Sequence, residues 1–124
     1  MIQQKSISIF HPQSALAEMY VAVLAQAGIN ASYFPDAKST QKILDDLTRR
    51  RPNLAIIAAD FSANGREGLD VLAETDIPVI IQHSGPEYEL EARELRAVDY
   101  FSGVMHANDI KDRVMHALTR GEDG

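Results

Sequence analysis

The residues best suited to chemistry in this chain stand at the ends of short apolar runs. His11 follows Ile7–Phe10, Asp60 follows Leu54–Ala59, and His83 comes two residues after Val79–Ile81. A carboxylate beside a loop can act as a nucleophile, and an imidazole titrates near neutral pH. Two histidines with one carboxylate are also a ligand set for divalent iron, and they suit zinc. Any such site requires a fold that brings the ends of these runs together.

The same three residues have plainer interpretations, which the sequence leaves open. Asp60 would also suit a loop position that caps the turn through Ser62 to Gly65, because short Asp side chains do this readily. An imidazolium at His11 or His83 paired with Asp60 would raise the pKa of that histidine above about 6.5 and make the site pH-sensitive. A metal site is favoured less, because its ligands would come from three separate loops without a spacing motif.

Five short apolar runs alternate with five segments of helical spacing. The predicted strands are Ile7–Phe10, Ala31–Phe34, Leu54–Ala59, Val79–Ile81 and Tyr100–Met105. The predicted helices lie between Ser14, as N-cap, and Gly28; between Ser39 and Arg51; around Leu69–Leu72, ending before Pro78; over about Pro86–Ala97; and from a cap at Asn108 or Asp109 through Leu118. This alternation predicts a parallel sheet with helices on both faces.

The predicted sheet has a definite functional edge. In such folds the site lies beyond the carboxyl ends of the strands, which places His11, Asp60, His83 and the segment Gly103–Met105 together. The third run is apolar without a break, as expected for a strand buried on both faces. The first run alternates more, which predicts that one of its faces is more exposed.

Composition limits the classes of function. The 124 residues suit one domain, over residues 1–124, with Gly121–Gly124 expected to form a disordered polar tail. The absence of cysteine excludes disulfides, thiolate metal sites and cysteine nucleophiles. Twelve basic against eighteen acidic residues give a net charge of −6, which argues against direct binding of nucleic acid or an anionic membrane. Met1–Ser8 has no apolar signal core, so a cytoplasmic location is expected.

From about Ser6 to Arg120 the chain resembles a response-regulator receiver domain of two-component signalling. The segments that carry the resemblance are Arg51–Asp60, Gly68–Leu72, Ile77–Ile81 and Ala97–Tyr100, in the order and spacing of that family. The resemblance implies an α/β, flavodoxin-like, doubly wound sheet of five parallel strands in the order 2-1-3-4-5. It also implies that Asp60 occupies the phosphoacceptor position and Tyr100 the position of an aromatic switch residue.

The chain departs from the receiver pattern at the positions that handle cations and phosphoryl oxygens. His11-Pro12 stands where the family has an acidic pair that holds magnesium. His83 replaces a hydroxyl residue, and Gly103, followed by Val104, replaces the lysine of a Lys-Pro pair. Mg²⁺ prefers oxygen ligands in octahedral geometry, so Mg²⁺ binding is expected to be weak or absent. These losses predict a degenerate receiver, or pseudo-receiver, whose Asp60 is not phosphorylated in a Mg²⁺-dependent reaction.

The resemblance implies a regulatory protein-interaction module in signal transduction rather than an enzyme. Its partner, or a second copy, would contact the fourth helix, fifth strand and fifth helix, within about Glu87–Thr119. Two alternatives remain open from the sequence. One is a receiver phosphorylated on Asp60 by a histidine kinase despite its altered site. The other is a small-ligand or metal-binding domain that uses His11, Asp60 and His83.

Overall fold

A computed structural model describes residues 5–123 of the chain, with side chains described for residues 5–119. Strands and helices alternate throughout. In chain order they are β1 (Ser6–Phe10), α1 (Ser14–Gln26), β2 (Asn30–Tyr33), α2 (Thr40–Arg50), β3 (Leu54–Ala58), α3 (Glu67–Glu74), β4 (Val79–His83), α4 (Glu89–Glu94), β5 (Asp99–Ser102) and α5 (Ala107–Asp123).

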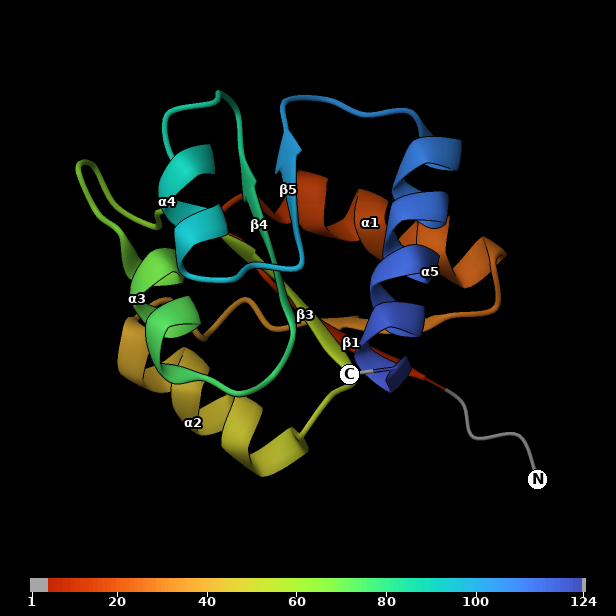
Figure 1. The fold of residues 1–124 in the computed structure, drawn as a ribbon, viewed down its shortest axis with the longest axis horizontal. Helices are drawn as coiled ribbons and strands as arrows, with labels where there is room; N and C mark the ends of the chain where they lie inside the picture. The colour runs from red at the N-terminus through yellow and green to blue at the C-terminus, as the bar shows by residue number, and fades with distance from the viewer. Residues whose placement is uncertain (1–4, 124) are drawn as a thin grey trace.

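The five strands form one parallel sheet in the order β2-β1-β3-β4-β5. Helices α1 and α5 cover one face, and α2, α3 and α4 cover the other (Figure 1). The predicted flavodoxin-like, doubly wound arrangement and its strand order are therefore confirmed. Because all strands run in the same direction, their carboxyl ends meet at one edge of the sheet, where loops are free to build a site.

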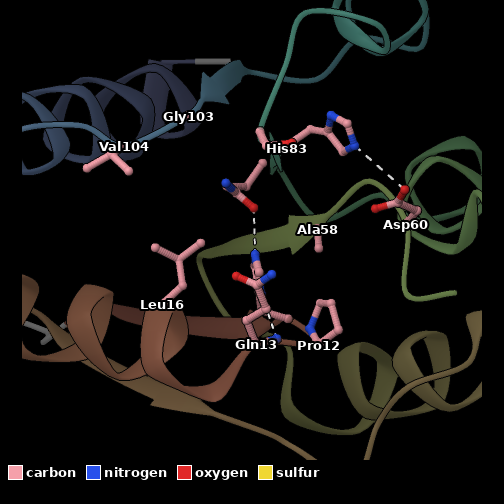
Figure 2. A pocket seen from close by; sticks show the side chains of 11 residues that line it. Pro12, Gln13, Leu16, Ala58, Asp60, His83, Gly103 and Val104 are labelled. Atoms are coloured by element: carbon pink, nitrogen blue, oxygen red, sulfur yellow. Dashed lines mark hydrogen bonds and ion pairs between the residues drawn. The ribbon is translucent and has the colours of Figure 1, made fainter. Parts of the chain in front are cut away.

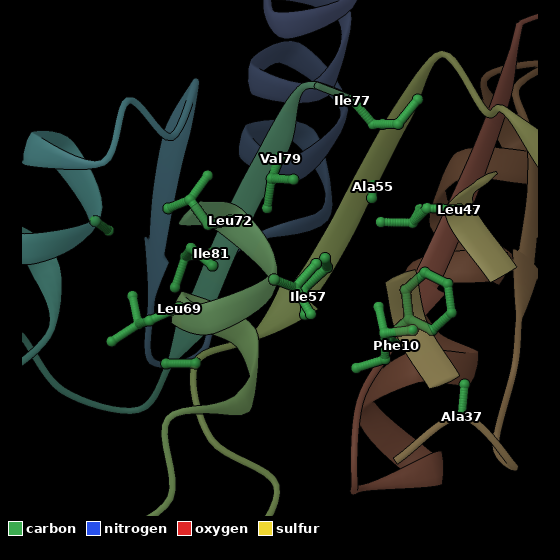
Figure 3. Close-up of a cluster of buried hydrophobic side chains, with 14 of the residues drawn as sticks. Phe10, Ala37, Leu47, Ala55, Ile57, Leu69, Leu72, Ile77, Val79 and Ile81 are labelled. Atoms are coloured by element: carbon green, nitrogen blue, oxygen red, sulfur yellow. The ribbon is translucent and has the colours of Figure 1, made fainter. Parts of the chain in front are cut away.

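Two apolar clusters, one on each face, hold the sheet in place. Cluster members under α2, α3 and α4 include Phe10, Leu47, Ile57, Leu69 and Ile81 (Figure 3). The cluster under α1 and α5 includes Ile9, Tyr20, Leu24, Phe101 and Val114. Neighbouring residues such as Ile56 and Ile57 enter opposite clusters, because side chains alternate across a strand.

Strands β3 and β1, which lie inside the sheet, are covered on both faces. All five residues of β3 are buried, as the unbroken apolar run predicted. The prediction of a more exposed face on β1 was wrong, since Ile7 to Phe10 are all buried and Ser8 is only 4% exposed. The reason is topological: β1 pairs with β2 and β3 at once, so even its serine lies beneath a layer of helices.

Several helix ends differ from those predicted. Ser39 caps α2 by accepting the Lys42 N–H, as expected, but Ser14 is not the cap of α1. The cap is Gln13, whose carbonyl accepts the N–H of Ala17. Helix α5 starts at Ala107, before the predicted cap residues Asn108 and Asp109.

Other boundaries also moved. Helix α5 continues through Gly121 to Asp123, so most of the expected tail is helical; Gly124 lies outside the described residues. Helix α4 is shorter than the predicted span from Pro86 to Ala97. Strand β5 ends at Ser102, because Gly103 adopts a φ of +67° and the chain turns away. Among the described residues, no helix is both long and apolar enough to cross a membrane.

Candidate functional site

A pocket of about 260 Å³ opens at the edge where β1, β3, β4 and β5 end (Figure 2). Its lining residues come from the loops after these four strands and from the start of α1. They are His11, Pro12, Gln13, Leu16, Ala58, Asp60, Gln82, His83, Ser84, Gly103 and Val104. The structure thus places the predicted site residues His11, Pro12, His83 and Gly103, together with Asp60, around one cavity. Tyr100 is not among the residues that line it.

His11 is buried and held by both ring nitrogens. Its Nδ1 accepts the backbone N–H of Gln13 at 3.0 Å, so the proton lies on Nε2, which donates to Gln82 Oε1 at 2.5 Å. Burial lowers the pKa of His11, although the Gln82 hydrogen bond and the charge of Asp60 act in the opposite direction. The predicted pairing of an imidazolium at His11 with Asp60, which would raise this pKa, is therefore wrong.

His83 lies between two carboxylates at the end of β4. Its Nε2 is 3.6 Å from Asp60 Oδ2, and its Nδ1 is 3.2 Å from Glu87 Oε2. The same Nδ1 atom is 3.2 Å from the backbone nitrogen of Gly85, whose N–H it accepts. The edge of the ring packs against Tyr88, with 4.7 Å between ring centroids. Of the two histidines predicted to pair with Asp60, only His83 approaches it.

The loop that carries Asp60 is fixed from the start of α3. Glu67 accepts the N–H of Phe61 at 2.9 Å and the hydroxyl of Ser62 at 2.7 Å. Burial opposes ionisation of Glu67, but these two hydrogen bonds lower its pKa below the ordinary value. Gly68 donates its N–H to Ala59 O at 3.0 Å. The loop is thus capped by Glu67, and the turn-capping role considered for Asp60 is filled by another side chain.

Tyr100 is turned inward at the end of the sheet. It is only 3% exposed, and its hydroxyl donates to Gly85 O at 2.6 Å. Burial raises the pKa of this phenol above its ordinary value. Gly85 is therefore held by Tyr100 through its carbonyl and by His83 through its N–H, which links the two residues by one peptide segment.

The charges around the pocket are of one sign. No lysine or arginine is among the described residues that line it, and Asp60 is its one carboxylate. Within the described part of the chain, no group of three His, Cys, Asp or Glu residues is placed to hold a metal ion. His11 could not join Asp60 and His83 as a metal ligand in this arrangement, because both of its ring nitrogens are already used in hydrogen bonds.

Sequence reasoning missed the residue that organises the pocket, Gln82. It is 5% exposed, and its side-chain oxygen accepts from His11 across 71 positions in the sequence. One signal was available: a glutamine that directly follows the apolar run Val79–Ile81 in a predicted central strand needs a hydrogen-bond partner when buried. Gln13, Leu16 and Ser84 were missed as well, because only the arrangement of the loops brings them to the cavity.

Several solved structures that match this architecture are described as receiver domains. A response regulator receiver domain protein from Methanospirillum hungatei is 16% identical, with a TM-score of 0.81 and coverage of 98% of each chain. A receiver domain protein from Clostridium thermocellum is 18% identical, with a TM-score of 0.79 and coverage of 95% of this chain and 97% of that one.

The same fold also occurs inside a longer protein. NtrX from Brucella abortus, solved with ADP, matches 97% of this chain over 27% of its own, at 17% identity and a TM-score of 0.80. No protein-family model and no curated protein sequence matches the chain. The sheet order, the helices on both faces and these structural matches together show that this chain has the fold of the response-regulator receiver domains.

Proposed function

We propose that the chain is a receiver-type regulatory module that works through protein contacts, without Mg²⁺-dependent phosphorylation of Asp60. The observation that carries this proposal is the charge of the pocket: one carboxylate and no cationic side chain among the described residues that line it. Phosphoryl transfer to Asp60 would gather negative charge there, and catalysis of such reactions depends on neutralising that charge.

The expected size of this effect supports the proposal. Loss of one electrostatic contact to the reacting group costs on the order of 3 kcal/mol of barrier, or about a hundredfold in rate. By the resemblance to receiver domains, His11-Pro12 stands in place of a metal-binding acidic pair, and Gly103 stands in place of a lysine. Two such losses would slow modification by about ten-thousandfold if they were additive.

The surface around α4, β5 and α5 supports a role in protein contacts. The large apolar side chains that the structure describes as exposed are Leu90, Val104 and Met115. They lie on α4, on the loop after β5 and on α5, within the segment expected to meet a partner or a second copy. A partner that contacts this segment would remove these three apolar side chains from water.

A beryllofluoride titration followed by NMR tests the absence of phosphoryl chemistry. Beryllofluoride with Mg²⁺ mimics a phosphorylated aspartate, so the spectrum should remain unchanged around Asp60 and Ser84. Mg²⁺ alone should also cause no shifts at these residues. Saturating shifts at these residues in the wild type, lost in Asp60→Asn, would contradict the proposal. They would favour the second candidate function, a receiver phosphorylated by a histidine kinase, for which Asp60 is suitably placed at the pocket.

Interaction through the α4–β5–α5 surface is tested by capture from cells that express the tagged protein. The double variant Leu90→Asp with Met115→Asp should lose the partners, or second copies, that the wild type retains. Ala22→Asp, on the exposed side of α1, is the matched control and should retain them. Equal capture by the double variant and the wild type would place the contact elsewhere.

A further inference from the structure

We infer that the pocket binds a basic side chain of a partner protein, with the ammonium of a lysine or the guanidinium of an arginine against Asp60. That a partner protein is present rests on the proposed function. That the bound group is basic rests on the chemistry of the pocket. It gives the site at the sheet edge a use that requires no phosphoryl transfer.

Asp60 faces one donor of the chain, His83 Nε2, at more than hydrogen-bond distance. No hydrogen bond to its carboxylate is made by the residues that the structure describes, and the nearest imidazole nitrogen, on His83, is 3.6 Å away. His11 offers Asp60 no proton, because its Nε2–H is directed to Gln82 and its Nδ1 accepts from Gln13. Oδ2 of Asp60 therefore faces His83, while Oδ1 has no partner among the described residues and can accept from a cation. Charge-assisted hydrogen bonds to carboxylates are among the stronger ones.

The shape of the pocket fits a charged group on an aliphatic stem. Pro12, Leu16 and Val104 give it apolar walls, while Asp60, Gln82 and Ser84 supply polar groups. Long basic side chains have this same division, since an apolar stem carries a charged head.

Gly103 leaves room where a side chain would otherwise stand. A Cβ atom built on it would find only Ser84 O within 4 Å, at a distance of 3.6 Å. The pocket, of about 260 Å³, is therefore open on the side of β5. No lysine or arginine among the described residues lines it.

Charge also selects between a protein side chain and a free amino acid. A free lysine or arginine carries both an α-carboxylate and an α-ammonium, and both charged groups would lose water beside the apolar rim residue Val104. A residue within a polypeptide carries neither charge. Val104, which is 94% exposed at the rim, offers an apolar contact for the backbone around the inserted side chain.

The test is an NMR titration of the whole chain with three blocked amino acids, each an Nα-acetyl, C-methylamide derivative. Blocked lysine and blocked arginine should produce saturating shifts at Asp60, His83 and Val104. Blocked norleucine, which has the aliphatic stem without the charge, should bind at least tenfold more weakly. Free lysine should also bind more weakly than its blocked form, because its two charged α groups would lose water at the rim.

Two variants control the measurement. Asp60→Asn removes the charge with little change of shape, and it should abolish the difference between blocked lysine and blocked norleucine. Asp112→Asn removes one charge from the exposed side of α5 and should leave all titrations unchanged. Both variants should keep the fold, because Asp112 is exposed and the one polar approach of Asp60 among the described residues is that to His83, at 3.6 Å. Their spectra outside the pocket check this.

The outcomes separate this inference from the proposed function. If blocked lysine and arginine cause no saturating shift, or bind no better than norleucine, the inference is overturned. If free lysine binds as tightly as its blocked form, the pocket takes a free amino acid, and the inference that a partner protein supplies the side chain is overturned. The Leu90→Asp with Met115→Asp variant leaves the pocket intact. Its failure to lose partners would overturn the α4–β5–α5 surface, whatever the titration shows.

Discussion

Gly68 is the position at which one added methyl group should do most damage to the site. A Cβ atom on Gly68 would overlap the carbonyl oxygen of Ala58 and lie 2.8 Å from its carbonyl carbon and 3.1 Å from Ala59 Cα. All three atoms belong to the backbone of the β3 end, so no side chain can rotate away. Ordinary carbon–carbon contacts are about 3.5–4.0 Å, so α3 would have to move outward by roughly 1 Å.

The cost follows from two opposing effects. Overpacking of this kind costs about 3 kcal/mol when backbone must move, and replacement of glycine by alanine in a helix returns at most about 1 kcal/mol. We therefore expect Gly68→Ala to lower the free energy of unfolding by about 2 kcal/mol, or the Tm by roughly 8 °C. The bond from Gly68 N–H to Ala59 O should weaken as well, which would displace the adjacent Asp60.

Urea denaturation and amide NMR shifts measure both effects. Gly85→Ala is the matched control, because a Cβ there would meet only the carboxylate end of Glu87, whose side chain is 65% exposed. It should cost less than about 1 kcal/mol. If Gly68→Ala is as stable as the wild type, and the shifts of Asp60 are unchanged, the close approach of α3 to β3 is not as described and the reasoning fails.

Three further predictions concern the groups around the sheet edge. Tyr100→Phe removes the hydroxyl donor to Gly85 O and should cost about 1–2 kcal/mol of unfolding free energy in urea; a loss below about 0.3 kcal/mol would show that this bond is not made. Asp99 has a lowered pKa because its bonds from Arg113 outweigh burial, so its contribution to stability is complete above pH 3.8 and is lost as the pH falls through the lower folded pKa. In Asp99→Asn, the free energy of unfolding measured in acid should no longer show this part of the pH dependence. The pKa of His11 is lowered below 6.5 in the folded protein, so folding is favoured above that pH and loses stability as the pH falls below it. NMR should show the neutral Nε2–H tautomer of His11 at pH 7, and an imidazolium there would contradict the structure.

The fold was readable from the sequence where a local pattern and the global arrangement agree. The unbroken apolar run of Leu54 to Ala58 predicts a strand with both faces covered, and the structure confirms this. The exposure of β1 was misjudged because Ser8 looks like a solvent-facing residue in its own segment. Its burial depends on strands and helices that join it from elsewhere in the chain, which a local period cannot reveal.

The candidate site was predictable in position but not in its bonding. Strand ends alone brought His11, Asp60 and His83 to one edge, because parallel strands end together. Which histidine faces Asp60 depends on Gln82, a partner 71 positions from His11, and on ring orientations fixed by the N–H groups of Gln13 and Gly85. Such bonds are set by packing and leave no periodic trace.

The central claim, that Asp60 does not accept a phosphoryl group with the help of Mg²⁺, is tested most directly by intact-protein mass spectrometry. The chain is incubated with acetyl phosphate and millimolar Mg²⁺, and Asp60→Asn is treated in parallel. Because the described lining of the pocket contains no cation and no acidic pair, the wild type should keep its unmodified mass. Stoichiometric addition of one phosphoryl group to the wild type, absent from Asp60→Asn, would contradict the account.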